Sequence, residues 1–200
     1  MKKLMFMFAF AVTAISMVSA QGYKVGDKAT DFRLKNVDGN YVSMSDYPDA
    51  KGFVVIFTCN HCPYAVAYED RIIELDKKYK PKGFPVIAIN PNDPAAEPRD
   101  SYELMQVRAR EKGFTFPYLF DDGQKVYPVY GATRTPHIYL LNRVGSDLVV
   151  AYIGAIDDNY RDASAVEEPF LSDAIDALLA GQKPDPDFTR AIGCTIKVAN

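Results

Sequence analysis

The hydrophobic pattern is organised around a continuous apolar run at residues 53–57, which Cys59 and Cys62 follow almost at once. A short apolar run of this kind is typical of a strand that is buried on both faces. After Pro63, apolar residues recur at steps of three and four as far as Tyr79, with charged residues between them, which predicts an amphipathic helix. Pro63 suits the first turn, because its missing N–H would be unpaired there anyway. The pattern therefore predicts a buried strand that delivers two thiols to the start of a helix.

A second apolar run at residues 84–89 predicts another buried strand. Strand, helix and strand in this order predict a right-handed parallel crossover. Upstream, short alternating stretches on either side of Asp38-Gly39 predict a hairpin. The first part of the domain is therefore expected to be a hairpin followed by a parallel unit.

The remainder of the chain alternates helical and extended patterns. A helix is predicted over 100–112, capped by Asp100 or Ser101 and ended by Gly113, while residues 114–122 are interpreted as irregular and 124–130 as a short helix. Residues 135–141 and 148–153 predict a strand pair. A last helix ends at Gly181 and begins either at a capping box on Ser164 or later, after Pro169.

The N-terminus changes the expected location. Met1-Lys2-Lys3 is followed by an apolar or small stretch at residues 4–18 and by Ser19-Ala20, which is the pattern of a secretory signal peptide. An uncleaved membrane anchor is the alternative, but the stretch is shorter than the roughly 20 residues that a spanning helix needs. We therefore expect a signal peptide at residues 1–20 and one domain at 21–200, exported to the periplasm or secreted, with no stable membrane insertion after cleavage.

Charge and length narrow the class of protein. Loss of Lys2 and Lys3 with the signal changes the formal net charge from −3 to −5. This acidic balance argues against nucleic acid as a partner and against a polybasic membrane surface. The remaining length suits a single domain whose core does not depend on disulfides.

The three cysteines indicate redox chemistry. Cys59 and Cys62 have C-x-x-C spacing, and a disulfide across so short a loop restrains little chain entropy, so a stabilising role explains it poorly. A closed zinc site would need a second, closely spaced pair of ligands, but elsewhere the chain supplies only Cys194 and His137, which are not paired in the sequence. We therefore expect no metal and no cofactor. His61, between the cysteines, is either a positive neighbour that stabilises the Cys59 thiolate or a solvated loop residue.

Several motifs together resemble one family. They are Val25-Gly26-x-x-Ala29-x-Asp31-Phe32-x-Leu34, Asp38-Gly39, Phe53–Thr58, Cys59-Asn-His-Cys62-Pro63 and Thr135-Pro136, and they look like the redoxin (AhpC/TSA-type) branch of the thioredoxin superfamily. The resemblance implies an α/β fold with a central mixed sheet flanked by helices, an N-terminal hairpin and an insertion before the strand that follows Pro136.

The resemblance also implies roles for individual residues. Cys59 takes the position of the nucleophile, and Cys62 that of the thiol that resolves the mixed disulfide. Pro136 takes the position of a cis-proline lying against the cysteines, with Thr135 before it. The implied activity is thiol–disulfide exchange with protein or small-molecule disulfides and thiols, and with a redox partner protein.

Two alternatives to this function stay open. Thr58 stands where thioredoxins commonly have Trp, Phe53 stands at the position of their buried acid, and the peroxiredoxin pattern P-x-x-x-[T/S]-x-x-C is missing. A thiol peroxidase that uses Cys59 or Cys194 is one alternative. A Cu(I) carrier that uses both motif cysteines and His137 is the other, since soft thiolates suit Cu(I).

Two residues and the direction of electron flow are left undecided by the sequence. Cys194 is either a third redox thiol or a small buried residue of the tail, because nothing in the sequence fixes its distance from the motif. His137 either lies near the motif, points into solvent or satisfies a hydrogen bond in the core. A histidine inside the motif favours an oxidant, whereas the N-terminal motif resembles exported reductases.

Overall fold

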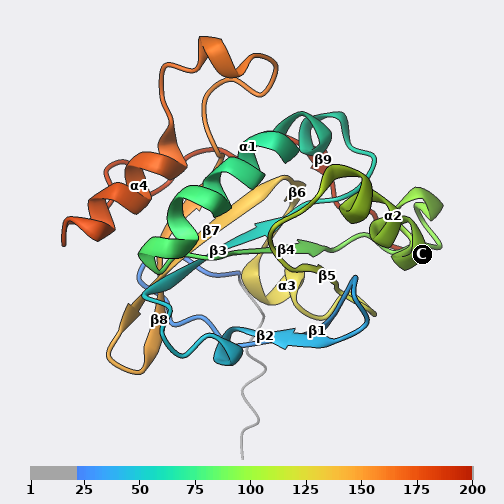
Figure 1. Ribbon diagram of the computed structural model, residues 1–200, viewed down its shortest axis with the longest axis horizontal. Helices are drawn as coiled ribbons and strands as arrows, with labels where there is room; N and C mark the ends of the chain where they lie inside the picture. The colour runs from blue at the N-terminus through green and yellow to red at the C-terminus, as the bar shows by residue number, and fades with distance from the viewer. Residues whose placement is uncertain (1–21, 200) are drawn as a thin grey trace, which may run out of the picture.

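A seven-stranded mixed sheet runs through the computed structural model, which describes residues 22–199 (Figure 1). The expected signal peptide at residues 1–20 lies outside the described residues. The strands are β1 (Arg33–Asn36), β2 (Tyr41–Ser43), β3 (Gly52–Phe57), β4 (Val86–Asn90), β5 (Tyr118–Phe120), β6 (Arg134–Thr135), β7 (His137–Val144), β8 (Asp147–Gly154) and β9 (Cys194–Thr195). The helices are α1 (Pro63–Tyr79), α2 (Tyr102–Lys112), α3 (Tyr127–Tyr130) and α4 (Phe170–Leu179).

The strand order of the large sheet is β2-β1-β5-β4-β3-β7-β8. Strand β3 pairs in parallel with β4, and α1 connects them, so the predicted parallel pairing across a helix is confirmed. On its other side β3 pairs antiparallel with β7, which forms a hairpin with β8. The predicted hairpin at Asp38-Gly39 is the β1–β2 pair. The expectation of an α/β, thioredoxin-like fold with a mixed sheet between helices is confirmed.

Alternation along the central strand builds a core on each face of the sheet. Val54 and Ile56 of β3 pack in the cluster that includes side chains of α1 and α4. Phe53, Val55 and Phe57 point into the other cluster, where the rings of Phe57 and Tyr130 of α3 meet with centroids 5.4 Å apart. A strand covered on both faces is apolar at every position, which is why residues 53–57 form an unbroken run. These two cores hold the end of β3, and with it the cysteines, in a fixed place.

Two predicted elements differ in the structure. The segment predicted to be irregular contains β5, whose pairing with β4 and β1 supplies hydrogen bonds that no local pattern reveals. The last helix begins at Phe170 with Pro169 as its N-cap residue, so the predicted capping box at Ser164 is wrong and the later start is confirmed. Ser164 instead lies in a short 3-10 segment, Ala163–Ala165, whose N-cap residue is Asp162.

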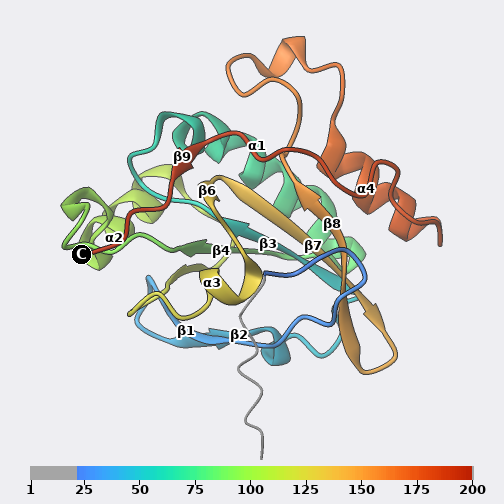
Figure 2. The same ribbon diagram turned by 180° about the vertical axis from the view of Figure 1, so that it is seen from behind.

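The C-terminal tail returns across the molecule after α4. Figure 2 shows it passing in front of α1 as β9, beside β6, toward a C-terminus close to α2. Strands β6 and β9 form a separate two-stranded sheet.

Among residues 22–199, no helix has the length and apolar character needed to cross a membrane.

Candidate functional site

The motif cysteines lie between the end of β3 and the start of α1. Cys62 is the N-cap residue of α1 and Pro63 is its first residue, which confirms the predicted place of Pro63. The two thiols precede the helix, because Pro63 itself opens it. Cys59 therefore lies three residues before the cap, on the loop. The side chains are almost fully buried, with exposed fractions of 3% for Cys59 and 0% for Cys62.

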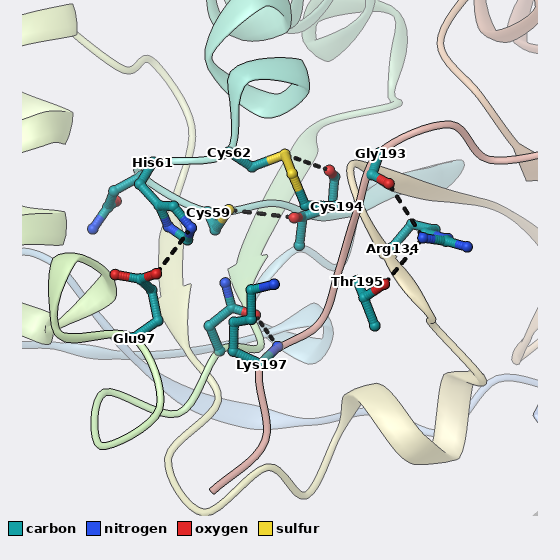
Figure 3. Close-up of a disulfide and its surroundings, with 12 residues drawn as sticks. Cys59, His61, Cys62, Glu97, Arg134, Gly193, Cys194, Thr195 and Lys197 are labelled. Atoms are coloured by element: carbon teal, nitrogen blue, oxygen red, sulfur yellow. Dashed lines mark hydrogen bonds and ion pairs between the residues drawn. A yellow bond between two sulfur atoms is a disulfide. The ribbon is translucent and has the colours of Figure 1, made fainter.

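Cys62 is joined by a disulfide to Cys194, and Cys59 is a free thiol (Figure 3). The Cα atoms of Cys62 and Cys194 are 6.1 Å apart, within the range that a disulfide spans. The motif does not hold the Cys59–Cys62 disulfide that the resemblance implied. The sequence left the place of Cys194 open, and the structure brings it into the site.

Backbone pairing of the tail places Cys194. In the β6–β9 sheet Cys194 is opposite Thr135. Gly193 lies so close to the backbone of Thr135 that a Cβ atom there would be 2.2 Å from the Thr135 carbonyl oxygen, so this position has no room for a side chain. Beyond the cysteine, Ile196 is buried in the core and the Lys197 N–H donates to Asn92 Oδ1 at 2.8 Å.

The residue before the cis-proline contacts both motif sulfurs. The Thr135–Pro136 bond is cis, as the resemblance implied. Cys59 Sγ is 3.3 Å from Thr135 Oγ1, and Cys62 Sγ is 3.2 Å from the Thr135 carbonyl oxygen. A disulfide sulfur has no proton to donate, so the second contact becomes a hydrogen bond when Cys62 is reduced. Thr135 thus contacts the sulfur atoms of both motif cysteines, one through its side chain and the other through its backbone.

His61 faces acidic side chains. Its Nδ1 atom lies 2.8 Å from Asp100 Oδ2, and its Nε2 atom lies 3.3 Å from Glu97 Oε2. Arg99 donates to both oxygens of Glu97 and lowers the pKa of this carboxyl group to about 2, so Glu97 is ionised at neutral pH. The imidazole of His61 therefore lies between two carboxylate groups.

Asp100 is a site residue whose place the sequence did not indicate. It was a candidate cap for α2, but Ser101 takes that role. Asp100 is fully buried, and its oxygens accept from the Asn60 N–H at 2.8 Å and from Asn92 Nδ2 at 2.5 Å. The signal that could have found it is the polar stretch from the end of β4 onward, where two asparagines precede three acids, the last of which is Asp100.

The surroundings of Cys59 favour the neutral thiol. Burial, followed by the negative charge of Asp100, raises the pKa of Cys59 to about 11, although the contact with Thr135 opposes this. The interpretation of His61 as a positive neighbour that stabilises a Cys59 thiolate does not describe this state. In the disulfide-bonded form Cys59 is a shielded thiol.

Removing the charge of Asp100 should make Cys59 more reactive. In the oxidised protein Cys59 is the single free thiol among three cysteines, so iodoacetamide labelling reports on it alone. In Asp100→Asn the repulsion is lost and the pKa of Cys59 falls, which should accelerate alkylation at pH 8 by about threefold to tenfold. The exposed Asp70→Asn substitution is the matched control and should react like the wild type. Equal rates in all three proteins would contradict this electrostatic account.

Three possible metal ligands lie together at the site. Donor atoms of Cys59, His61 and Asp100 are all within 4.8 Å of one another. A thiolate, an imidazole and a carboxylate form a ligand set that suits zinc, but a metal here would displace the hydrogen bonds that Asp100 already accepts. The set proposed for Cu(I) is not assembled, because Cys62 is in a disulfide and His137 Nδ1 accepts the Thr133 N–H at 3.3 Å.

Of the roles that the sequence left open for His137, the structure supports a hydrogen bond in the core. It begins β7 opposite Phe57, and its side chain is buried against Tyr139, with ring centroids 5.0 Å apart. Burial lowers the pKa of His137 to about 4, so it is neutral at physiological pH.

Similar proteins place this geometry in context. An uncharacterised conserved protein from Geobacillus kaustophilus is 37% identical, with 90% of this chain and 94% of that chain aligned and a TM-score of 0.82. A hypothetical protein from Sinorhizobium meliloti is 32% identical, with 90% and 97% aligned and a TM-score of 0.81. The thiol-disulfide oxidoreductase ResA of Halalkalibacterium halodurans is 26% identical over 68% of this chain and 72% of its own length.

The family match covers most of the fold. Residues 25–152 match the AhpC/TSA family, a stretch that runs from before the N-terminal hairpin into β8 and contains the motif, Asp100 and the cis-proline. The tail with Cys194 lies beyond this match. The chain belongs to the AhpC/TSA family of thioredoxin-like redox proteins.

Proposed function

We propose that the chain is a thiol–disulfide oxidoreductase in which Cys59 is the nucleophile and Cys62 the resolving thiol. The observation that carries the proposal is the convergence of a free thiol and a disulfide on Thr135, which contacts both motif sulfurs. Thiol–disulfide exchange needs such neighbours, because a thiolate must reach the sulfur of a disulfide. Family membership and the ResA relative support the same class of reaction.

The proposed reaction runs in two displacements. The Cys59 thiolate attacks one sulfur of a substrate disulfide, forms a mixed disulfide and releases the first substrate thiol. The Cys62 thiolate then attacks the Cys59 sulfur, forms the Cys59–Cys62 disulfide and releases the second thiol. The protein loses two electrons and two protons, which the substrate gains. Because Cys62 caps α1, the unpaired N–H groups and the helix dipole favour its thiolate.

Export belongs to the proposal. The N-terminal segment has the composition of a signal peptide, and a disulfide persists in the oxidising compartments outside the cytoplasm.

The direction of electron flow follows from the reduction potential of the protein. Equilibration of the purified protein with glutathione buffers measures this potential, and about 30 mV corresponds to about 1.4 kcal/mol for a two-electron couple.

Single-thiol variants test the assignment of the nucleophile. Cys62→Ser/Cys194→Ser retains Cys59 alone, and Cys59→Ser/Cys194→Ser retains Cys62 alone. With oxidised glutathione, the first variant should accumulate a mixed disulfide at Cys59, detected by intact mass. The second should accumulate far less, because Cys62 is fully buried. Mixed disulfide in the Cys62-only variant alone would overturn the assignment.

Comparing hydrogen peroxide with oxidised glutathione as the oxidant tests the peroxidase alternative. This alternative is supported by a relative from Mycobacterium tuberculosis whose name places it among the peroxiredoxins. The absence of the peroxiredoxin pattern P-x-x-x-[T/S]-x-x-C around Cys59 and Cys62 argues against this alternative. The proposal predicts exchange with oxidised glutathione that is faster than oxidation by the same concentration of peroxide. The reverse order would favour the peroxidase.

A further inference from the structure

Cys62 has two potential sulfur partners in this site. The C-x-x-C loop brings Cys59 to it from one side, and the tail brings Cys194 from the other (Figure 3). Cys59, Cys62 and Ala65 form a small buried cluster of their own, against which Cys194 and Tyr64 pack. A disulfide that lies beside a free thiol is open to intramolecular exchange, since a thiolate attacks whichever disulfide sulfur it can reach.

The tail holds Cys194 by contacts that do not involve its sulfur. Residues 134–135 and 194–195 pair as β6 and β9, and the Arg134 side chain contacts Thr195 Oγ1 at 3.0 Å. Downstream, the Asp93 N–H donates to the Lys197 carbonyl oxygen at 3.0 Å. These contacts keep the thiol next to Cys62 after reduction, so its attack is intramolecular and gains the advantage of proximity.

We propose that Cys194 is a third redox residue, which takes over the disulfide from the motif and so returns Cys59 to the thiol form. This inference rests on the proposed function, since the motif must first be oxidised by a substrate disulfide. The Cys194 thiolate attacks the Cys62 sulfur of the Cys59–Cys62 disulfide. A Cys62–Cys194 bond forms, the Cys59–Cys62 bond breaks, and Cys59 leaves as a thiolate and takes up the proton that Cys194 lost. No electron is gained or lost in this step.

The surroundings of Cys59 favour this direction. The leaving thiol is strongly stabilised in its protonated form, because burial and Asp100 raise the pKa of Cys59. The disulfide-bonded state of the structure, with Cys59 free and neutral, is the end point of the transfer.

The exposed end of the new disulfide indicates the class of partner. Cys194 is partly exposed, whereas Cys59 and Cys62 are almost fully buried. An external thiol therefore reaches the Cys194 sulfur first, forms a mixed disulfide there and releases the Cys62 thiolate. A second thiol of the same partner then releases Cys194 as a thiol and leaves the partner oxidised. A dithiol, protein or small molecule, completes the cycle at the tail rather than at the motif.

Peptide mapping of the full mature chain follows the transfer. Trypsin leaves Cys59 and Cys62 together on peptide 52–71 and Cys194 on peptide 191–197. The reduced protein is mixed with oxidised glutathione, and free thiols are alkylated after increasing times. We expect peptide 52–71 with an internal disulfide first. It should then be replaced by a cross-link to peptide 191–197 in which Cys59 carries the alkyl group.

Two variants decide between transfer and a merely structural bond. Cys194→Ser should stop at the internal Cys59–Cys62 disulfide and be re-reduced more slowly by dithiothreitol. Ile192→Ser, an exposed substitution in the same tail, should map and react like the wild type. If Cys194 stays alkylated while the wild type turns over, the inference fails and the proposed function stands. If the Cys62–Cys194 disulfide is present but does not react, and neither the wild type nor a variant exchanges with glutathione, the inference and the proposed function both fail.

Discussion

Reduction of the Cys62–Cys194 disulfide should lower the free energy of unfolding by about 2–5 kcal/mol. The bond joins residues that are 132 positions apart, and a cross-link over so long a loop removes much conformational freedom from the unfolded chain. In the folded protein it ties the tail to the start of α1. Urea unfolding of the wild type, with and without dithiothreitol, measures the difference.

Two serine variants assign this effect to one bond. Cys194→Ser should unfold at nearly the same urea concentration in both redox states, because a disulfide across the short Cys59–Cys62 loop restrains little. Cys59→Ser retains the long bond and should keep the full sensitivity to reductant. A wild type whose midpoint does not move on reduction would show that the tail contributes nothing to stability through its disulfide.

The parts of the fold that the sequence predicted are those with a strong local pattern. The unbroken apolar run at 53–57 and the helical spacing from Pro63 to Tyr79 became β3 and α1 with boundaries close to those expected. Asp38-Gly39 similarly produced its hairpin. In each case neighbouring residues carry the information, because the periodicity reflects which face of the element is buried.

The missed strand illustrates the opposite case. Strand β5 has three residues, Tyr118–Phe120, and follows Pro117 directly. A stretch this short shows no alternation, and its extended conformation is stabilised by neighbours from β4 and β1 that are distant in sequence. Local propensity is a weak guide wherever non-local pairing decides.

The same limit applies to the site. Cys59, Cys62 and the cis-proline were identified because they belong to compact motifs. Neither the pairing of Cys62 with Cys194 nor the burial of Asp100 follows from spacing, since both depend on how distant loops fold over the motif. The raised pKa of Cys59 was not predictable for the same reason: the helix start was visible in the sequence, but the burial of the thiol and the neighbouring acid were not.

Acid should destabilise the protein through His137. Its pKa is lowered from 6.5 to about 4 by burial, so as the pH falls below 6.5 the unfolded chain binds a proton that the folded protein does not. The stabilisation is complete above pH 6.5 and is lost as the pH falls to about 4, a total of about 3 kcal/mol. Urea unfolding of the wild type at a series of pH values between these limits measures this loss.

Comparison with His137→Asn separates this effect from the carboxylates, which titrate in both proteins. Asparagine offers an oxygen to the Thr133 N–H in place of the imidazole nitrogen but does not ionise in this range. The variant should lose less stability than the wild type between pH 6.5 and pH 4, and the gap between the two proteins should narrow steadily toward the acid end. Parallel pH profiles would mean that His137 is protonated in the folded protein as readily as in the unfolded chain, and that the core around β7 admits its charge.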